Sequence, residues 1–190
     1  EEQTLDISMF NVPGCSYCED PIYVDQNTCE NFGVNGAKWI QDSGITESQC
    51  ESLNGVFFNG FIAGFQFELF GISVTDVGSA PNGFTVSTSA TSVLGFSLSG
   101  ALIPPIINDP QRLVTVSFEN FEGTDICFGS DEQQNVISDA DAKNQETHWG
   151  DCACAAVWLH SNCLPARGKA MALPINSRQH STKDLSPTPR

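Results

Sequence analysis

Hydrophobic and polar residues alternate one by one along a stretch near the middle of the chain. In "GFQFELF", Phe65, Phe67 and Leu69 share one parity, whereas Gln66 and Glu68 share the other. Successive side chains of a β-strand point to opposite faces, so this period of two predicts a strand with one buried face. The stretch is also too short and too polar to cross a membrane, and we expect no membrane insertion.

The same alternation recurs in short segments on both sides of this strand. The turn-forming stretches "SAPNG" and "PPIINDP" lie between some of the segments, and no long helical pattern intervenes. Short strands at this spacing predict an all-β fold, an antiparallel β-sandwich. We expect the first segment and the "GFQFELF" strand to be neighbours. The segments are 4–10, 82–90, 92–103, 112–121, 124–129 and 135–141.

The pattern changes between residues 11 and 55, where four cysteines and two short helix signatures occur. Asp25 is a good N-cap for a helix that stops at Gly33, and Thr46 and Gln49 have the spacing of a capping box. Helices of about two turns are marginal alone in water. We therefore predict a disulfide-stapled insertion with two short helices, placed between a first strand at 1–10 and a sandwich at 56–152.

The last part of the chain, residues 153–190, differs again in charge and composition. It holds five basic residues and one acidic residue, although the whole chain has a net charge of −15. Four prolines from Pro165 onward disfavour a long regular helix. We expect an extended basic arm that lies on a neighbouring subunit, with Trp158, Arg167, Lys169 and Arg178 among its contact residues.

Eight cysteines in a small acidic chain indicate disulfides and an oxidising compartment. Four of them, Cys15, Cys18, Cys29 and Cys50, allow three pairings, which the residues alone leave open. Zinc is the alternative for these four and for a second set formed by Cys152, Cys154, His160 and Cys163. We expect disulfides rather than metal.

A further set of blocks carries a family resemblance. The blocks are "GFQF" at 64–67, "VLGFS" at 93–97 and "GDC" at 150–152. Together they resemble a cohesin-like β-sandwich module of the kind present in surface and secreted proteins of marine plankton and bacteria and in their viruses. The resemblance covers residues 62–152 and the first strand, and it implies a disulfide between Cys127 and Cys152. Residues 23–39 are similar to short Cys-Glu repeats of such proteins.

Charge and motifs exclude several classes of function. A chain with 23 acidic and 8 basic residues repels phosphates, so we expect no nucleic-acid partner. "GFSLSG" is similar to a nucleophile elbow, but we expect Ser97 and Ser99 to be outward positions of a strand, which is the wrong context. No histidine lies near them in the sequence, and we expect no catalytic residue and no enzyme.

Two binding sites remain as candidates. Asp131, Asp139 and Asp141 lie in an acidic run that offers the oxygen ligands calcium prefers, although the spacing is not that of an EF-hand loop. We expect a solvated acidic surface and no cofactor, with calcium as the alternative. Trp149, which we place outside the core strands, is the candidate platform for a sugar.

These observations favour a non-enzymatic structural or adhesive subunit of an extracellular assembly, such as a surface filament, a sheath or a virus particle. Its partners would be further copies or neighbouring structural subunits at a cell or virion surface. A secreted carbohydrate-binding module with a polysaccharide partner is the alternative. A metal-dependent secreted enzyme ranks third.

Overall fold

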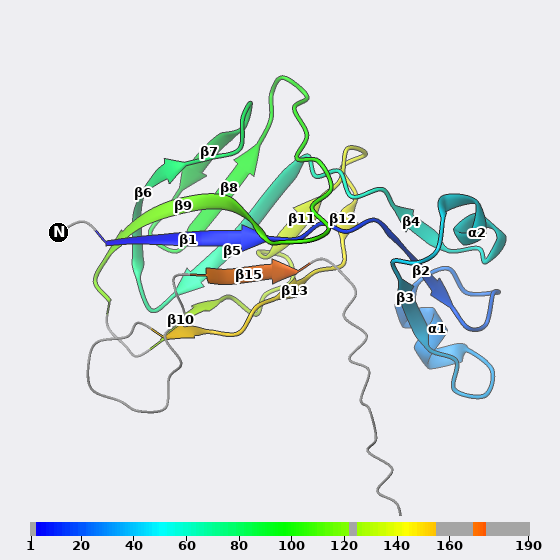
Figure 1. Ribbon diagram of the computed structural model, residues 1–190. Helices are drawn as coiled ribbons and strands as arrows, with labels where there is room; N and C mark the ends of the chain where they lie inside the picture. Colours follow the sequence, from blue (N-terminus) through cyan, green and yellow to red (C-terminus); the bar gives the residue numbers. More distant parts are fainter. Residues whose placement is uncertain (1–2, 122–124, 155–168, 174–190) are drawn as a thin grey trace, which may run out of the picture.

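Two β-sheets packed face to face form the larger part of the molecule (Figure 1), and the computed structural model describes residues 3–121, 125–154 and 169–173. All pairings in the first sheet are antiparallel except that between β15 and β1, which is parallel. Its order is β13 (His148–Trp149), β15 (Lys169–Leu173), β1 (Gln3–Met9), β9 (Gln111–Glu119) and β6 (Ser73–Ser79).

The second sheet is built around β5 (Gly64–Phe70), the strand predicted from "GFQFELF". One edge of β5 pairs with β8 (Ser92–Phe96), which in turn pairs with β7 (Thr85–Thr88). The two ends of β5 pair with β11 (Val136–Ser138) and β10 (Asp125–Phe128). The short strands β12 (Asn144–Gln145) and β14 (Ala153–Cys154) extend these two in turn.

Alternate residues of the facing strands fill the space between the sheets, which confirms the predicted all-β sandwich. Each fully buried large apolar side chain stabilises the fold by about 1.5–3 kcal/mol relative to the same side chain exposed to water. The odd positions of both predicted strands point into this core: Leu5, Ile7 and Met9 from β1, and Phe65, Phe67 and Leu69 from β5.

The first strand and β5, which we expected to be neighbours, are not neighbours within one sheet. β1 pairs with β9 and β15, whereas β5 belongs to the opposite sheet. Alternation identifies the buried face of a strand but not its hydrogen-bonding partner, because every strand offers the same backbone groups. The two strands face each other across the core.

The cysteine-rich insertion folds as a small unit beside the sandwich (Figure 1). Its sheet has the order β3 (Trp39–Asp42), β2 (Gly14–Cys18) and β4 (Val56–Phe58), so the unit extends three residues past the predicted end at 55. The Cys15–Cys50 disulfide fastens α2 (Glu47–Ser52) to β2, and the Cys18–Cys29 disulfide fastens α1 (Gln26–Phe32) to the same strand.

Both predicted helix starts are present. The Asp25 carboxylate accepts a hydrogen bond from the backbone N–H of Thr28 at 2.9 Å. The Gln49 side chain accepts one from the backbone N–H of Thr46, also at 2.9 Å. These bonds satisfy backbone donors that the first turn of a helix leaves without partners.

Residues 153–190 do not form an arm wholly separate from the sandwich, and that expectation is wrong for two segments. Ala153–Cys154 pairs with β10, and Lys169–Leu173 lies between β1 and β13 in the other sheet. The prediction of an extended arm was based on charge and proline content, but neither prevents a short segment such as "KAMAL" from forming a strand in a sheet. The remaining residues of the predicted arm lie outside the described part.

Candidate functional site

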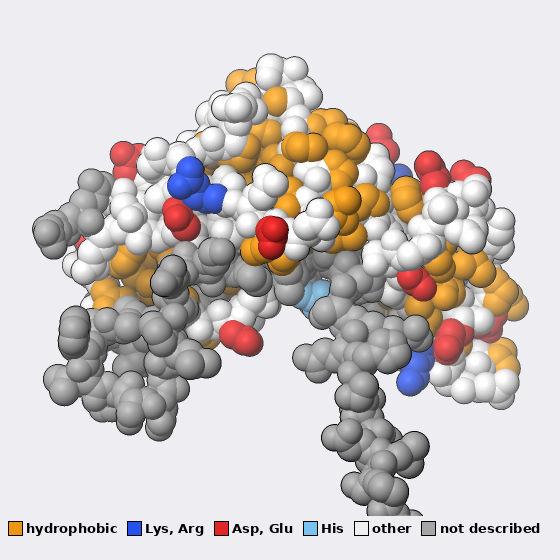
Figure 2. Space-filling view, viewed as in Figure 1, with side chains coloured by type: hydrophobic (Ala, Val, Ile, Leu, Met, Phe, Trp, Pro, Cys, Tyr) orange, Lys and Arg blue, Asp and Glu red, His pale blue; other side chains and the backbone are white. Residues whose placement is uncertain are grey.

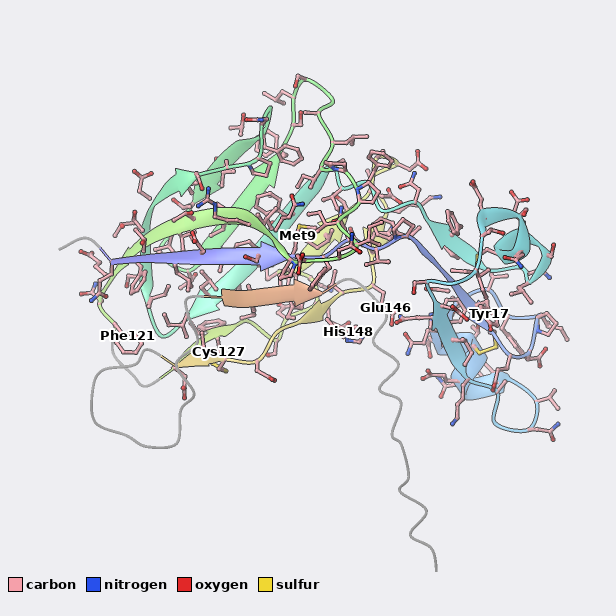
Figure 3. The ribbon with its side chains drawn as sticks, in the orientation of Figure 1. Met9, Tyr17, Phe121, Cys127, Glu146 and His148 are labelled. Carbon is pink, nitrogen blue, oxygen red and sulfur yellow. A yellow bond between two sulfur atoms is a disulfide. The ribbon has the colours of Figure 1, made fainter. Side chains whose placement is uncertain are left out.

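A groove runs along the line where the insertion meets the sandwich. It has a volume of about 690 Å³ and is lined by Tyr17, Glu19, Gln26, Trp39, Ile40, Gln41, Asp42, Ser43, Glu146 and His148. We call it the seam groove. Figure 3 shows Glu146 and His148 on the side of the sandwich that faces the insertion, from which Tyr17 comes. Binding sites often form at such junctions between packed units, and this volume is within their usual range.

Trp39 is held in place from both sides of the junction. It is the first residue of β3, paired with Cys18, and its ring packs against a small cluster that contains Cys18 and Cys29. Its indole N–H donates a hydrogen bond to Oε2 of Glu146 at 3.3 Å. Glu146 lies between β12 and β13, so this bond ties the insertion to the sandwich.

The lining of the seam groove is acidic and partly aromatic. Glu19, Asp42 and Glu146 supply three carboxylates, and among the described residues that line the groove only His148 has a basic side chain. Carboxylates next to Trp and Tyr rings attract ammonium and guanidinium groups, through charge and through the negative ring faces. The groove is therefore suited to a cationic ligand and repels an anionic one.

A second surface feature lies on the insertion around α1. Ile22, Val24, Phe32 and Val34 are exposed large apolar side chains, with 77% of Ile22 and 68% of Phe32 accessible to solvent. We call these four residues the insertion patch, and Figure 2 shows hydrophobic side chains at the surface of this unit. Clustered exposed apolar residues mark interaction surfaces. The short helix α1 buries only Cys29, so its other apolar residue faces water.

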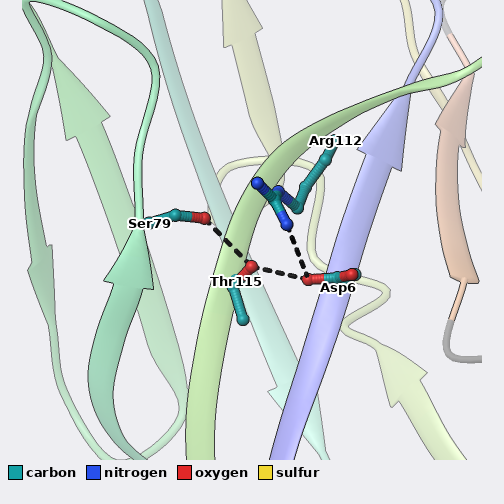
Figure 4. Close-up of polar contacts among 4 residues, drawn as sticks. All are labelled: Asp6, Ser79, Arg112 and Thr115. Carbon is teal, nitrogen blue, oxygen red and sulfur yellow. Dashed lines mark hydrogen bonds and ion pairs between the residues drawn. The ribbon is translucent and has the colours of Figure 1, made fainter.

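A small polar network links three strands of the first sheet, β1, β9 and β6. On the outer face of the first sheet, Thr115 donates a hydrogen bond to Asp6 at 2.5 Å and accepts one from Ser79 at 3.0 Å (Figure 4). Arg112 lies 3.9 Å from the same carboxylate. The side chains of Arg112 and Asp6 are about half exposed to solvent, and an exposed ion pair contributes at most about 1 kcal/mol to stability. We therefore interpret the network as part of the ordinary solvated surface of the sheet.

The aromatic residue proposed as a sugar platform occupies a different place than expected. Trp149 lies in β13 and packs against the core, with its ring centroid 4.9 Å from that of Phe128 and 6.0 Å from that of Phe67. The prediction that it lies outside the core is therefore wrong, because a two-residue strand gives no alternation to read. The backbone of Lys169 is in β15, whereas Trp158, Arg167 and Arg178 lie outside the described residues.

The acidic residues proposed for calcium bind backbone groups of their own turns. Asp139 accepts hydrogen bonds from the backbone N–H groups of Asp141 and Lys143, both at 2.9 Å, and Asp131 accepts one from Gln133. Within the described ranges, no three or more His, Cys, Asp or Glu side chains converge on a common point.

Six of the cysteines form three disulfides. Of the three pairings open to the first four cysteines, the structure has Cys15–Cys50 and Cys18–Cys29, so these four sulfurs are bonded to one another in pairs. Cys127 pairs with Cys152, as the family resemblance implied. That pairing removes Cys152 from the second proposed zinc set. Cys154 is in β14, while His160 and Cys163 lie outside the described residues.

Ser97 and Ser99 are not strand positions, contrary to expectation. β8 ends at Phe96, and the Ser97 hydroxyl accepts a hydrogen bond from the backbone N–H of Ala101 at 2.8 Å, which closes a turn. Gly100 within this turn has a φ of 75°, a conformation in which glycine is favoured. The alternation seen in the sequence therefore ran past the end of the strand.

The seam groove was missed because its parts are far apart in the sequence. Trp39 and Glu146 are separated by 107 residues, and no local pattern links them. The insertion patch could have been predicted from the local sequence, because apolar residues flank a short helix in which only one residue is buried.

No helix among the described residues is long and apolar enough to cross a membrane. Comparison with known proteins gives no relative: no protein-family model matches the chain, and neither curated proteins nor solved structures give a significant match.

Proposed function

We propose that the protein is a non-enzymatic structural subunit of an extracellular assembly whose copies join head to tail. The observation that carries the proposal is the insertion patch, in which four apolar side chains are exposed on a disulfide-stapled unit. The disulfides support an oxidising compartment, and the patch supports a protein partner. The resemblance to surface modules supports a filament, sheath or virus particle as the assembly.

The partner that fits the patch is residues 155–168 of a second copy. This segment contains Val157, Trp158, Leu159 and Leu164 and one basic residue, Arg167. The insertion that would receive it is acidic, because residues 11–58 hold seven acidic residues and one basic residue. Apolar burial would supply most of the affinity, at about 1.5–3 kcal/mol for each fully buried large side chain, and the charges would favour the correct partner.

The positions of β14 and β15 support a contact between copies rather than within one copy. The segment joins the end of β14 to the start of β15. Figure 1 shows β10, with which β14 pairs, and the start of β15 at the end of the sandwich away from the insertion. The patch of the same copy is at the opposite end. A contact between unlike surfaces at opposite ends does not close on itself in a dimer, and it extends into rings or filaments.

Light scattering on the full chain tests the proposal over a range of concentrations. We expect oligomers that grow with concentration and that are lost in Phe32→Ser and in Trp158→Ser. Leu98→Ser is the matched control, because Leu98 is 85% exposed but lies on the sandwich. Mixing the two interface variants should give dimers and nothing larger, since one patch and one segment remain intact in the mixture.

Two results contradict the proposal. A wild-type chain that stays monomeric at its highest soluble concentration has no such interface. Equal loss of assembly in Leu98→Ser and Phe32→Ser would show that general surface hydrophobicity, rather than the insertion patch, drives association.

A further inference from the structure

The C-terminal end of the strand β15 lies beside the seam groove. β15 runs parallel to β1, toward the insertion, and its last residue, Leu173, pairs with His148. His148 lines the seam groove. The segment that follows, residues 174–190, therefore starts at the rim of the groove. We propose that this segment binds in the seam groove of its own chain, with Arg178 and Lys183 meeting the groove carboxylates.

Charge makes the segment complementary to the groove. Residues 174–190 hold three basic residues and one acidic residue, in a chain where acidic residues outnumber basic ones by almost three to one. The groove presents Glu19, Asp42 and Glu146 to them. A guanidinium bound to a carboxylate makes charge-assisted hydrogen bonds, and the rings of Trp39 and Tyr17 add attraction for a cation.

The segment is long enough to reach the groove carboxylates, and its attachment beside the groove allows weak contacts to hold it there. Arg178 is five residues beyond Leu173, and an extended chain spans up to about 3.3–3.6 Å per residue, so it reaches roughly 17 Å from the rim. Attachment at the rim gives the segment a high effective concentration, on the order of millimolar for a short flexible link. The groove of the same chain is thus occupied before that of a neighbour.

The bound segment would fasten the insertion to the sandwich. The Trp39–Glu146 hydrogen bond already joins the two at this place, and cations between Glu19 or Asp42 on one side and Glu146 on the other would add to it. We call the bound segment the strap. The inference itself does not depend on assembly, because the contact forms within one chain.

Zero-length carbodiimide cross-linking of the full chain tests the inference. The reagent joins a lysine amine to a carboxylate in contact with it. We expect Lys183 linked to Glu19, Asp42 or Glu146, and not to Asp76, which lies in β6 at the opposite edge of the sheet from β13. In an equal mixture of ¹⁴N and ¹⁵N chains, at a concentration where the protein is monomeric, the linked peptides should carry the same isotope.

A matched pair of variants separates a specific contact from chance proximity. Arg178→Gln removes one cation of the segment and leaves Lys183 as the probe, so its cross-links to the groove should fall about two- to fivefold. Arg112→Gln removes a cation on the sandwich and should change nothing. High salt should lower the yield, because the contacts are exposed to solvent.

Three results would overturn the inference: links from Lys183 to Asp76 as frequent as those to the groove, groove links found only between chains of different isotope, or an unchanged yield in Arg178→Gln. A failure of head-to-tail assembly would leave the test intact, because links within a chain form in the monomer.

Discussion

Asn11 is a polar side chain at a fully buried position, and it joins three parts of the chain. It lies just after β1, and its Nδ2 donates hydrogen bonds to the carbonyl oxygens of Gly60 at 2.6 Å and Pro104 at 2.8 Å. Gly60 is on the chain that returns from the insertion. Asn11 therefore holds the exit and the entry of the insertion together, even though its own Oδ1 has no hydrogen-bond partner.

Replacing Asn11 tests this role at the scale of one residue. Asn11→Ala should lower the free energy of unfolding by about 1–3 kcal/mol, because two buried carbonyls lose their donor. Asn11→Asp should be worse, since an acceptor-only carboxylate would face two carbonyl oxygens. Urea unfolding of both variants measures the difference. If Asn11→Asp is as stable as the wild type, the amide is not a donor to these carbonyls.

Asp25 gives the start of α1 a dependence on pH. Hydrogen bonds from the Thr28 hydroxyl and backbone N–H hold the pKa of this carboxyl below its usual value of 3.8. A carboxyl whose pKa is lower in the folded state than in the unfolded state stabilises the fold at pH values above its unfolded-state pKa. This contribution is lost as the pH falls through the folded-state pKa. The protection of the Thr28 amide from hydrogen exchange, measured relative to the intrinsic rate of the unfolded chain at the same pH, should therefore fall in acid below pH 3.8. Asp25→Asn keeps an N-cap that does not titrate, and exchange in it should lack this acid-dependent step.

At the scale of elements, the pairing of β5 with β8 depends on a glycine under an aromatic ring. Phe65 and Gly95 are directly opposite in the register, and a Cβ added to Gly95 would lie 2.1 Å from Cζ of Phe65. The ring thus occupies the space that a side chain at residue 95 would need. This explains a glycine in the middle of a strand, where it is otherwise unfavourable.

Gly95→Ala should therefore destabilise the protein by about 1–3 kcal/mol, because the buried Phe65 ring must move in a packed core. Gly78→Ala in β6 is the control, since its new Cβ would make ordinary contact with Thr115 at 3.7 Å. Thermal unfolding of the two variants compares them. Equal stability would mean that the ring does not cover Gly95.

At the scale of the whole molecule, β15 decides where the folded unit ends. It pairs with β1 over four residues and with β13 over two, so it completes the first sheet between them. A sheet that loses this strand exposes two unpaired edges, which invite aggregation. The boundary predicted at Cys152 would cut inside the sandwich.

Two truncations separate the roles of the C-terminal residues. A chain ending at Leu173 should keep the wild-type stability and the head-to-tail assembly and should lose only the strap. A chain ending at Cys154 should lose stability on the order of 3 kcal/mol or more, from strand hydrogen bonds that contribute about 0.5–1.5 kcal/mol each. Urea unfolding and light scattering measure both effects. Equal stability of the two chains would show that β15 does not belong to the sheet of its own chain.

The sequence by itself determined the features that depend on near neighbours. The parity of Phe65, Phe67 and Leu69 indicated a buried strand face, and the caps at Asp25 and Thr46 marked both helix starts. These signals are readable because the interacting groups lie within a few residues of one another. The even cysteine count pointed to disulfides for a different reason, because cysteine content reflects the redox compartment.

The tertiary structure alone decided which distant groups meet. It chose among three cysteine pairings, placed β1 and β5 in opposite sheets, put Trp149 against the core and brought Trp39 to Glu146. Backbone donors and acceptors are the same in every strand, so partner choice depends on how the whole chain packs. A site formed between two packed units has no counterpart in the local sequence, because its residues become neighbours only when both units are folded and in contact.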